Sequence, residues 1–512
     1  MRRAAKRILP LLGVATPVLA SDSLAVSATR DPVSQALVAI LIIGVFSLLA
    51  MEKAHRVLVI FAAVALMWLF TYLTPYRLIP FETAKDAIDL NVIVLLAAMM
   101  AVVGVLKTTG VFSWAVGRLL RTSGGRPAVI VALMIWFTGL LSGVADNVTT
   151  VIFATPMALE IAARLRIRPM AILLPMVMAS NIGGTATLIG DPPNILIGSG
   201  AGLSFVAFVL NLTAPVLIML VILDWYSSRY FAADYAGGVQ QIDASTLTLP
   251  PLTDRVLLHW GLAITALIFV GFFTHSLTGM PVSIPAAVGA AALFVVQDIL
   301  HLRRRDSVLD DRVHGVIRAM EGDIEWPTLA FFALLFIAVG AAVATGLVGS
   351  LSHGLASFID WGAANLGLSA NGTLLFAALL ILWASGLLSA LIDNIPYVAV
   401  TIPIIGSLAE RLPGDTEILW WALALGACLG GNGTVIGASA NVTVVGLAER
   451  AGAHISFGQF ARFGARVAGT TLLISSVFIT AQIYFGRAIT QGAMLAGLLI
   501  YLAGRTLLRR SR

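Results

Sequence analysis

Three acidic residues of this 512-residue sequence, Asp146, Asp191 and Asp393, fall well inside apolar stretches. The sequence places no Lys, Arg or His at the same depth, because the basic residues lie in loops or at the ends of the stretches. A buried carboxylate without a cationic partner must be protonated, bind a mobile cation or face water. These are the properties of a proton- or sodium-coupling site. The alternatives are a polar residue satisfied at a hydrated hairpin tip and, for Asp191, a helix cap.

Neutral oxygens and amides accompany these acids and suit a hard cation or a small oxygen-rich solute. The candidate ion- or substrate-binding residues are Asp146, Asn147, Thr149, Asn181, Thr185, Thr187, Asp191, Asn194, Asp393, Asn394, Asn432, Thr434, Ser439 and Asn441. Within this set, Asp146, Asn147, Asp393 and Asn394 are the candidate Na⁺ ligands. The only cofactor that these side chains indicate is the coupling ion itself, H⁺ or Na⁺.

Many of these residues occur twice at one spacing, since Asp146 and Asp393 are 247 residues apart and the same offset relates their neighbours. Ser142, Asn147, Val151 and Pro156 pair in this way with Ser389, Asn394, Val398 and Pro403. Gly183, Gly184, Thr187, Ile189, Gly190 and Asn194 pair with Gly430, Gly431, Thr434, Ile436, Gly437 and Asn441. One offset held over both clusters indicates an internal structural repeat.

The second cluster of each copy interrupts an apolar run. Residues 181–194 contain five glycines and prolines that weaken a helix, namely Gly183, Gly184, Gly190, Pro192 and Pro193. Broken backbone at membrane depth is tolerated where it is buried in protein or lines a watery cavity. The half-helix ends at such breaks would direct N–H groups and carbonyls at a bound ion. The alternative is a glycine-packed helix crossing.

Composition indicates an all-α polytopic membrane protein, because 59% of the residues are hydrophobic and only 11% are charged. Apolar runs long enough to cross a bilayer cover residues 33–51, 56–74, 89–107, 170–200, 203–224, 256–274, 281–300, 327–347, 418–447, 463–486 and 489–507. The formal charge of +6 comes from basic loops, which insertion topology explains, so nucleic-acid binding is not indicated. The single Cys428 excludes an internal disulfide.

The distribution of basic residues favours two re-entrant hairpins, at residues 127–165 and 372–410, over two further pairs of crossing helices. With hairpins, most of the 32 Lys and Arg residues fall on one side, as the positive-inside rule expects. Each repeat then has five crossings, an odd number, so the second copy is inverted. Two inverted five-crossing repeats, each with a re-entrant hairpin and a broken helix, are a common architecture of secondary transporters.

This topology divides the chain into five parts. Residues 1–20 are a signal peptide or a short N-terminal helix, with Arg2, Arg3, Lys6 and Arg7 before an apolar run. Repeat 1 covers residues 33–224, a linker 225–255, and the inverted repeat 2 residues 256–486. Residues 487–512 form a C-terminal helix and a basic tail. The charge distribution predicts a bacterial-type inner membrane protein with a cytoplasmic C-terminus.

The duplicated motifs resemble the ion transporter superfamily, and most closely its ArsB/NhaD/P-protein branch with a citrate transporter-like domain. The resemblance rests on residues 142–150, 181–194, 389–396 and 429–441. It implies a scaffold and a transport domain that move by an elevator-like shift, often in a homodimer. Dicarboxylate transporters of the superfamily read Ser-Asn-Thr at the hairpin tips. The tips here read Asp146-Asn147-Val148 and Asp393-Asn394-Ile395, a pattern similar to the P-protein and NhaD-like members.

The sequence therefore predicts a secondary active transporter coupled to H⁺ or Na⁺, with Na⁺/H⁺ antiport as the leading hypothesis. A proton-coupled permease for arsenite, a small oxyanion or an organic acid is the first alternative, with the broken-helix N-termini as the substrate site. An anion channel, in which the breaks line a continuous pore, is the second. No phosphate-binding loop, Gly-x-Ser-x-Gly elbow or His-Glu-x-x-His helix occurs, so an enzyme is not indicated. The predicted partners are a small solute, the lipid bilayer and a second copy of the chain.

Overall fold

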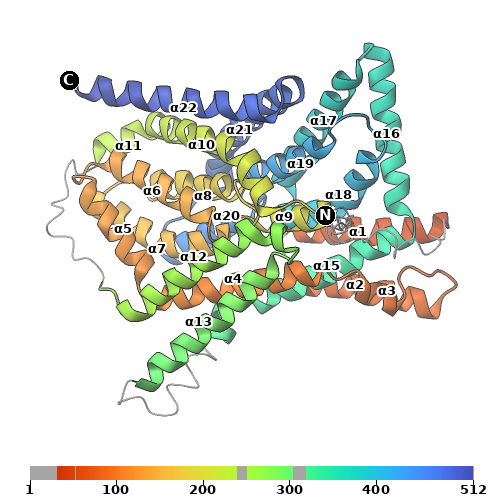
Figure 1. Cartoon of the computed structure of the whole chain (residues 1–512), viewed down its shortest axis with the longest axis horizontal. Helices are drawn as coiled ribbons and strands as arrows, with labels where there is room; N and C mark the ends of the chain where they lie inside the picture. Colours follow the sequence, from red (N-terminus) through yellow and green to blue (C-terminus); the bar gives the residue numbers. More distant parts are fainter. Residues whose placement is uncertain (1–30, 52–53, 239–250, 304–318, 511–512) are drawn as a thin grey trace, which may run out of the picture.

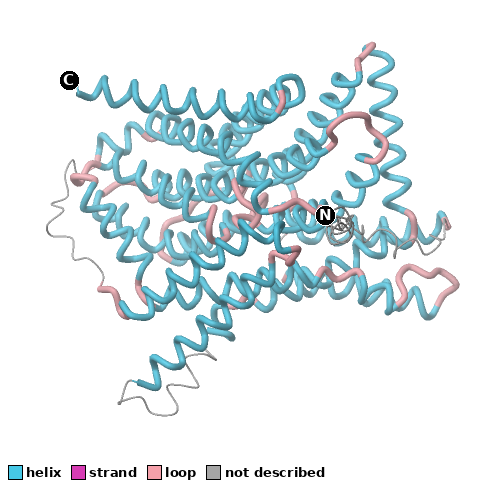
Figure 2. The backbone as a smooth tube through the Cα atoms, in the orientation of Figure 1, coloured by secondary structure: helices cyan, strands magenta, loops and turns pink. Residues whose placement is uncertain are grey.

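The computed structural model of the chain describes residues 31–51, 54–238, 251–303 and 319–510. All regular elements in these ranges are helical (Figure 2). Ten of the described helices are long and apolar enough to cross a membrane, which confirms an all-helical, multi-span membrane protein. The predicted signal peptide or helix at residues 1–20 lies outside the described residues, as does the middle of the predicted linker.

The helices of the first half follow the predicted apolar runs. They are α1 (Pro32–Ala50), α2 (Arg56–Leu73), α3 (Phe81–Asp86), α4 (Leu90–Thr108), α5 (Val111–Thr122), α6 (Pro127–Ser142), α7 (Asn147–Leu165), α8 (Met170–Gly184), α9 (Pro192–Ala201), α10 (Phe205–Tyr230) and α11 (Ala232–Gly237). Helix α10 continues to Tyr230, past residue 224, where the predicted apolar run ends.

The second half is also a series of helices. They are α12 (Arg255–Thr278), α13 (Ser283–Arg303), η1 (Ala319–Asp323), α15 (Trp326–Ala344), α16 (Leu347–Leu366), α17 (Ala370–Leu391), α18 (Asn394–Ala409), α19 (Glu417–Gly430), η2 (Gly431–Gly433), α20 (Ser439–Arg450), α21 (Phe457–Phe485) and α22 (Arg487–Arg510). The breaks predicted within residues 170–200 and 418–447 are present, between α8 and α9 and between α19 and α20.

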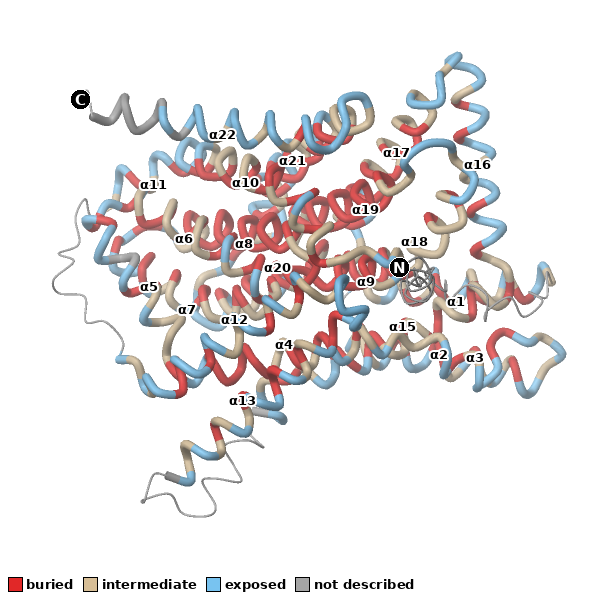
Figure 3. The backbone as a smooth tube through the Cα atoms, viewed as in Figure 1, coloured by how far each residue is buried: buried red, intermediate tan, exposed pale blue. Residues whose placement is uncertain are grey.

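The helices form two groups, which are visible in Figure 1. The frame consists of α1, α2, α4, α12, α13 and α15, in which α2 packs on α15 and α13 packs on α4. The core bundle consists of α6–α10 and α17–α21, with both hairpins and both broken helices. Helices α8 and α19 are its centre and are almost entirely buried (Figure 3). Apolar side chains on the outside of the frame, such as Ile40 and Leu277, are exposed, as expected for a surface that faces lipid.

Glycines allow the hairpins to pack closely on the central helices. A Cβ atom at Gly183 on α8 would lie 1.9 Å from the carbonyl oxygen of Gly139 on α6. A Cβ atom at Gly430 on α19 would lie 2.3 Å from the carbonyl oxygen of Gly386 on α17. Only glycine fits at these two contacts, because a side-chain atom this close to a backbone oxygen would force the helices apart.

Each hairpin tip lies beside a helix break. Thr187 Oγ1, in the first break, donates to the carbonyl oxygen of Gly143 at the first tip (2.7 Å). Thr434 Oγ1, in the second break, donates in the same way to Ala390 O (2.5 Å). Helix α6 runs parallel to α8, since Thr138 Oγ1 donates to Met176 O one to two turns before the tip (3.3 Å). A short turn joins the end of α7 to the start of α8, so the first hairpin starts and finishes at the same end of the bundle.

The base of that hairpin is fixed by an ion pair outside the apolar region. Arg168, in the turn between α7 and α8, donates two hydrogen bonds to the carboxylate of Asp234 on α11, at 2.5 and 2.7 Å. This carboxylate raises the pKa of the Arg168 guanidinium above its ordinary value. Paired hydrogen bonds of this kind orient both side chains and hold α11 against the turn.

The last helix, predicted as a crossing at residues 489–507, spans Arg487–Arg510 and packs along α10 and α21. Gln491 Nε2 donates to Asn211 O on α10 (2.6 Å), and Gln482 Nε2 on α21 donates to Asn211 Oδ1 (2.9 Å). Helix α22 therefore packs along the outside of the core bundle, next to α10 (Figure 1).

Candidate functional site

The two tip carboxylates begin helices. Asp146 is the N-cap of α7, where its Oδ1 accepts from Thr149 N (2.9 Å) and its Oδ2 accepts from Thr149 Oγ1. Asp393 is the N-cap of α18, where its Oδ1 accepts from Ile395 N (3.1 Å) and its Oδ2 accepts from Ser439 Oγ (2.7 Å). Both side chains are half-buried. Each carboxylate thus lies at the positive end of a helix dipole, which stabilises its charge.

The third acid, Asp191, is buried in the first break, with 1% of its surface exposed. It occupies the N-cap position of α9 but makes no side-chain capping hydrogen bond, so it does not serve as a cap here. Asn394 Nδ2, at the tip of the second hairpin, approaches its Oδ2 at 3.5 Å. Asn394 directly follows Asp393, so this contact brings the second hairpin tip against the first helix break.

A network of hydrogen-bonded asparagine side chains connects the two halves of the protein. Asn181 on α8 accepts from Asn147 Nδ2 (3.2 Å) and donates through its Nδ2 to the side-chain oxygens of Asn432 (3.0 Å) and Asn441 (2.9 Å). Thr185 Oγ1 donates back to Asn181 O (2.8 Å). These buried polar groups satisfy one another's hydrogen bonds. A substitution at Asn181 would therefore remove hydrogen bonds at both breaks.

Asn194 and Asn441 hold the two breaks in shape. Asn194 Nδ2 donates to the carbonyl oxygens of Gly184 (3.3 Å), Thr185 (3.2 Å) and Thr187 (2.8 Å). Asn441 Nδ2 donates to Gly431 O and Thr434 O, each at 2.8 Å. These amides satisfy carbonyls that the broken helices leave free. The side chains of Asn194, Asn441, Thr187 and Thr434 therefore stabilise the backbone of the breaks. Their role as ion ligands stays a prediction.

Some buried polar atoms near the tips have no hydrogen-bond partner in the described part of the chain. They include Asn147 Oδ1, Asn432 Nδ2, Ser142 Oγ and Thr150 Oγ1. Native proteins seldom leave such atoms unpaired, and a bound ion or small polar molecule is one way of pairing them. The described residues contain no cluster of three His, Cys, Asp or Glu residues that could hold a metal ion.

A cavity of about 750 Å³ opens onto Asp393 from the end of the bundle where α2 and α15 begin. Its polar lining comes from His55, Arg56, Glu325, Asp393, Ser439, Thr443 and Arg450. Arg56 reaches the neighbourhood of Asp393, since its Nη1 donates to Ser439 Oγ (3.3 Å). The sequence placed this arginine at the end of an apolar run, and its reach into the site was missed because the contact joins the start of α2 to the start of α20, far apart in the chain. Glu325 and Thr328 were missed for the same reason.

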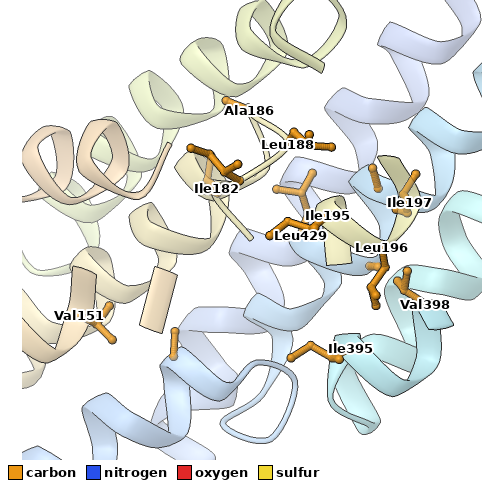
Figure 4. Packing of buried hydrophobic residues seen from close by; sticks show 14 of the residues in the cluster. Val151, Ile182, Ala186, Leu188, Ile195, Leu196, Ile197, Ile395, Val398 and Leu429 are labelled. Atoms are coloured by element: carbon orange, nitrogen blue, oxygen red, sulfur yellow. The ribbon is translucent and has the colours of Figure 1, made fainter. Parts of the chain in front are cut away.

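Apolar packing surrounds the polar centre. Figure 4 shows Ile195 of α9 beside Leu429 of α19, and Leu196 beside Val398 of α18. All four belong to the buried hydrophobic cluster of the protein. In the described residues no Lys, Arg or His forms an ion pair with Asp146, Asp191 or Asp393. The low dielectric of this packing makes the unpaired carboxylate of Asp191 costly unless a proton or a cation neutralises it.

Comparisons with known proteins agree with this architecture. The sequence model of the citrate transporter family, CitMHS, matches residues 46–426. An uncharacterized transporter of Mycobacterium tuberculosis is 37% identical over 444 residues, covering 85% of this chain and 96% of that protein. The P protein of Homo sapiens is 28% identical over 504 residues, covering 82% of this chain and 57% of the P protein.

Among solved structures, the YdaH transporter of Alcanivorax borkumensis has a similar fold. The TM-score is 0.58 at 20% sequence identity, with 89% of this chain and 99% of that chain covered. The crystal structure of YdaH is described as revealing an unusual topology. At this level of identity the likeness concerns the fold alone.

Proposed function

Since the chain belongs to the CitMHS citrate transporter family and is a secondary transporter, we propose that it couples transport to H⁺ or Na⁺ through Asp146, Asp191 and Asp393. Membership of this family confirms the resemblance on which the sequence prediction rested, whereas the substrate and the coupling ion are our proposal. Na⁺/H⁺ antiport is the form of coupling that we favour. Asp191 is the residue to which we assign the coupled proton.

The observation that carries this proposal is the burial of Asp191 without an ion-pair partner in the described residues. A carboxylate that is 1% exposed and has no ion-pair partner in the described residues is neutral or is neutralised by a bound cation. The half-buried Asp146 and Asp393 are more accessible, with Asp393 lining the cavity. Two accessible acids and one enclosed acid suit an exchange in which a cation enters while a proton leaves.

The proposal includes two inverted repeats. Several matched contacts support it, among them Gly139–Gly183 with Gly386–Gly430 and Thr187–Gly143 with Thr434–Ala390. Helices α5 and α16 lie at opposite ends of the molecule in Figure 1, as expected when the second repeat is upside down relative to the first. In an elevator-like shift, the core bundle would carry the site past the frame. A homodimer, a bacterial-type inner membrane location and a cytoplasmic C-terminus complete the proposal.

Purified protein in liposomes tests the proposal. With a pH gradient across the membrane, sodium added outside should dissipate the gradient at a rate that depends on the sodium concentration. Asp191→Asn should reduce this rate to that of empty liposomes, because an amide cannot release a proton. Thr401→Val on α18, whose hydroxyl is bonded to Tyr397 O within its own helix, is the matched control and should leave the rate unchanged. Full activity of Asp191→Asn would contradict the assignment of the proton.

Proton-coupled transport of an organic acid is a second candidate. The description of the family as citrate transporters and the presence of His55, Arg56 and Arg450 in the cavity favour it. Their side chains could attract a carboxylate into the cavity before it reaches the broken-helix N-termini. A panel of radiolabelled organic acids, measured in the same liposomes at two pH values, separates the candidates. Uptake that rises with the pH gradient and needs no sodium would favour this function over antiport.

A further inference from the structure

Arg56 lies between two carboxylates that come from different helix groups of the protein. Its Nη1 donates to Ser439 Oγ on α20 (3.3 Å), and its Nη2 donates to Thr328 Oγ1 on α15 (2.7 Å). Its Nη2 also lies 4.0 Å from Glu325 Oε2. One guanidinium therefore contacts both the frame, through α15, and the core bundle, through α20. The side chain is only about one third exposed, with 32% of its surface accessible.

The hydroxyls beside Arg56 have a defined hydrogen-bond direction. Arg56 has no acceptor, so Ser439 and Thr328 each receive a hydrogen bond from it and are left with their own proton to donate. Ser439 Oγ donates to Asp393 Oδ2 (2.7 Å), and Thr328 Oγ1 donates to Glu325 Oε2 (2.8 Å). The result is two short chains in which a cation, a hydroxyl and a carboxylate follow one another. The positive charge is thus shared between Asp393 and Glu325.

We propose that Asp393, Ser439, Thr328 and Glu325 form a cation-binding site that the Arg56 guanidinium fills in this conformation. During transport, a sodium ion takes the place of the guanidinium. This inference rests on the proposed coupling to a cation and adds two ligands, Thr328 and Glu325, that the sequence did not identify. Two carboxylates and two hydroxyls are hard oxygen donors of the kind that alkali and alkaline-earth cations prefer.

Competition between Arg56 and sodium gives the site a conformational role. While the guanidinium contacts both helix groups, it ties α20 of the core bundle to α15 of the frame. A sodium ion bound by Asp393 and Ser439 releases Arg56. The two cations compete for the single negative charge of Asp393, and they repel each other. When the sodium ion keeps Asp393 and Ser439 as ligands and gives up Thr328 and Glu325, the core bundle is free to move relative to the frame. Arg56 acts through the site as a positioning residue and does not itself bind substrate.

Sodium affinity tests the competition. The dissociation constant of radiolabelled sodium from the purified protein is compared with the KM for sodium in liposomes. In Arg56→Gln both should fall by about tenfold, which corresponds to about 1.4 kcal/mol, because the internal competitor is gone. Arg56→Lys keeps the charge and should stay near wild type. Ser439→Ala and Glu325→Gln remove ligands and should raise both constants by a similar factor.

Arg450→Gln is the matched control, since Arg450 lines the same cavity and, within the described part of the chain, makes no hydrogen bond to Asp393, Ser439, Thr328 or Glu325. It removes an equal charge and should leave sodium affinity unchanged. If Arg56 only stabilised the fold, Arg56→Gln would lower the yield of folded protein and kcat without tightening sodium binding, which would overturn the inference. If the wild-type protein binds sodium and Arg56→Gln binds it with the same affinity, the inference is overturned, but the proposed function is not. Wild-type protein that neither binds nor transports sodium overturns it together with the sodium form of the proposed function.

Discussion

The two helix breaks share their construction and differ in their chemistry. In both, a glycine contact brings the hairpin close, a threonine donates to the tip, and an asparagine binds the free carbonyls. Several other pairs of positions with the same offset differ. Among them are Asn181 and Cys428, Thr185 and Asn432, Asp191 and Ala438, and Pro192 and Ser439. Shared residues build the breaks, whereas the polar centre combines shared asparagines, such as Asn147 and Asn441, with residues that occur in one half only, such as Asn181 and Asp191. The buried proton-binding group is therefore assigned to one half only.

The glycine contacts should give the largest effects if the two breaks share one construction. Gly183→Ala and Gly430→Ala each place a Cβ atom against a carbonyl oxygen, at 1.9 and 2.3 Å. We expect each to reduce the free energy of unfolding by about 3 kcal/mol or more, measured as loss of folded protein in thermal scans in detergent. Gly469→Ala on α21, where a Cβ meets nothing within 4 Å, is the control and should be neutral or slightly stabilising. A stable Gly430→Ala beside an unstable Gly183→Ala would show that the two halves pack differently.

The asparagines that close the breaks should be equivalent. Asn194→Ala and Asn441→Ala each leave buried carbonyls without a donor, at a cost of about 2 kcal/mol. The expected result is two similar decreases in melting temperature. Asn365→Ala is the control, because its exposed amide is bonded to Trp361 O within α16 and should matter little. A large decrease for only one of the pair would contradict a common construction.

Substitutions at Asn181 and Cys428 should have different effects on stability, because these paired positions differ in chemistry between the two halves. Asn181→Ala leaves Asn432 and Asn441 without their donor and should cost about 2 kcal/mol. Cys428→Ala removes a weak donor that contacts Asn194 Oδ1 (3.5 Å) and also lies beside Asp191, and it should cost about 0.5 kcal/mol. Calorimetry of the two variants under the same conditions measures the difference. Equal costs would mean that the polar centre is symmetric, against our assignment.

The threonines of the breaks should give the smallest effects. Thr187→Val and Thr434→Val each remove one hydrogen bond to a hairpin tip and keep the shape of the side chain, at a cost of about 1 kcal/mol. Thr470→Val on α21, whose hydroxyl bonds within its own helix, is the control. Loss of sodium transport in either break variant without loss of stability would show that its hydroxyl is an ion ligand.

Much of the fold follows from the sequence, because helix breaks and hairpin tips depend on local residues. The glycines at 183 and 430 and the paired prolines at 192–193 locate the breaks, and apolar runs locate the spans. The candidate site was harder to predict for two reasons. Repetition drew attention to Thr187 and Asn194, which bind backbone carbonyls. The contacts of Arg56 with Ser439 and Thr328 join residues that are hundreds of positions apart, so no local pattern reports them.

The central claim is that Asp191 carries the coupled proton, and infrared difference spectroscopy tests it most directly. Purified protein in a lipid film is exposed alternately to buffers with and without sodium, and the carbonyl band of protonated carboxylic acids is followed. We predict that sodium changes this band in the wild type and that the change is absent in Asp191→Asn but present in Thr401→Val. An identical band change in Asp191→Asn would contradict the account, because the proton would then be held elsewhere.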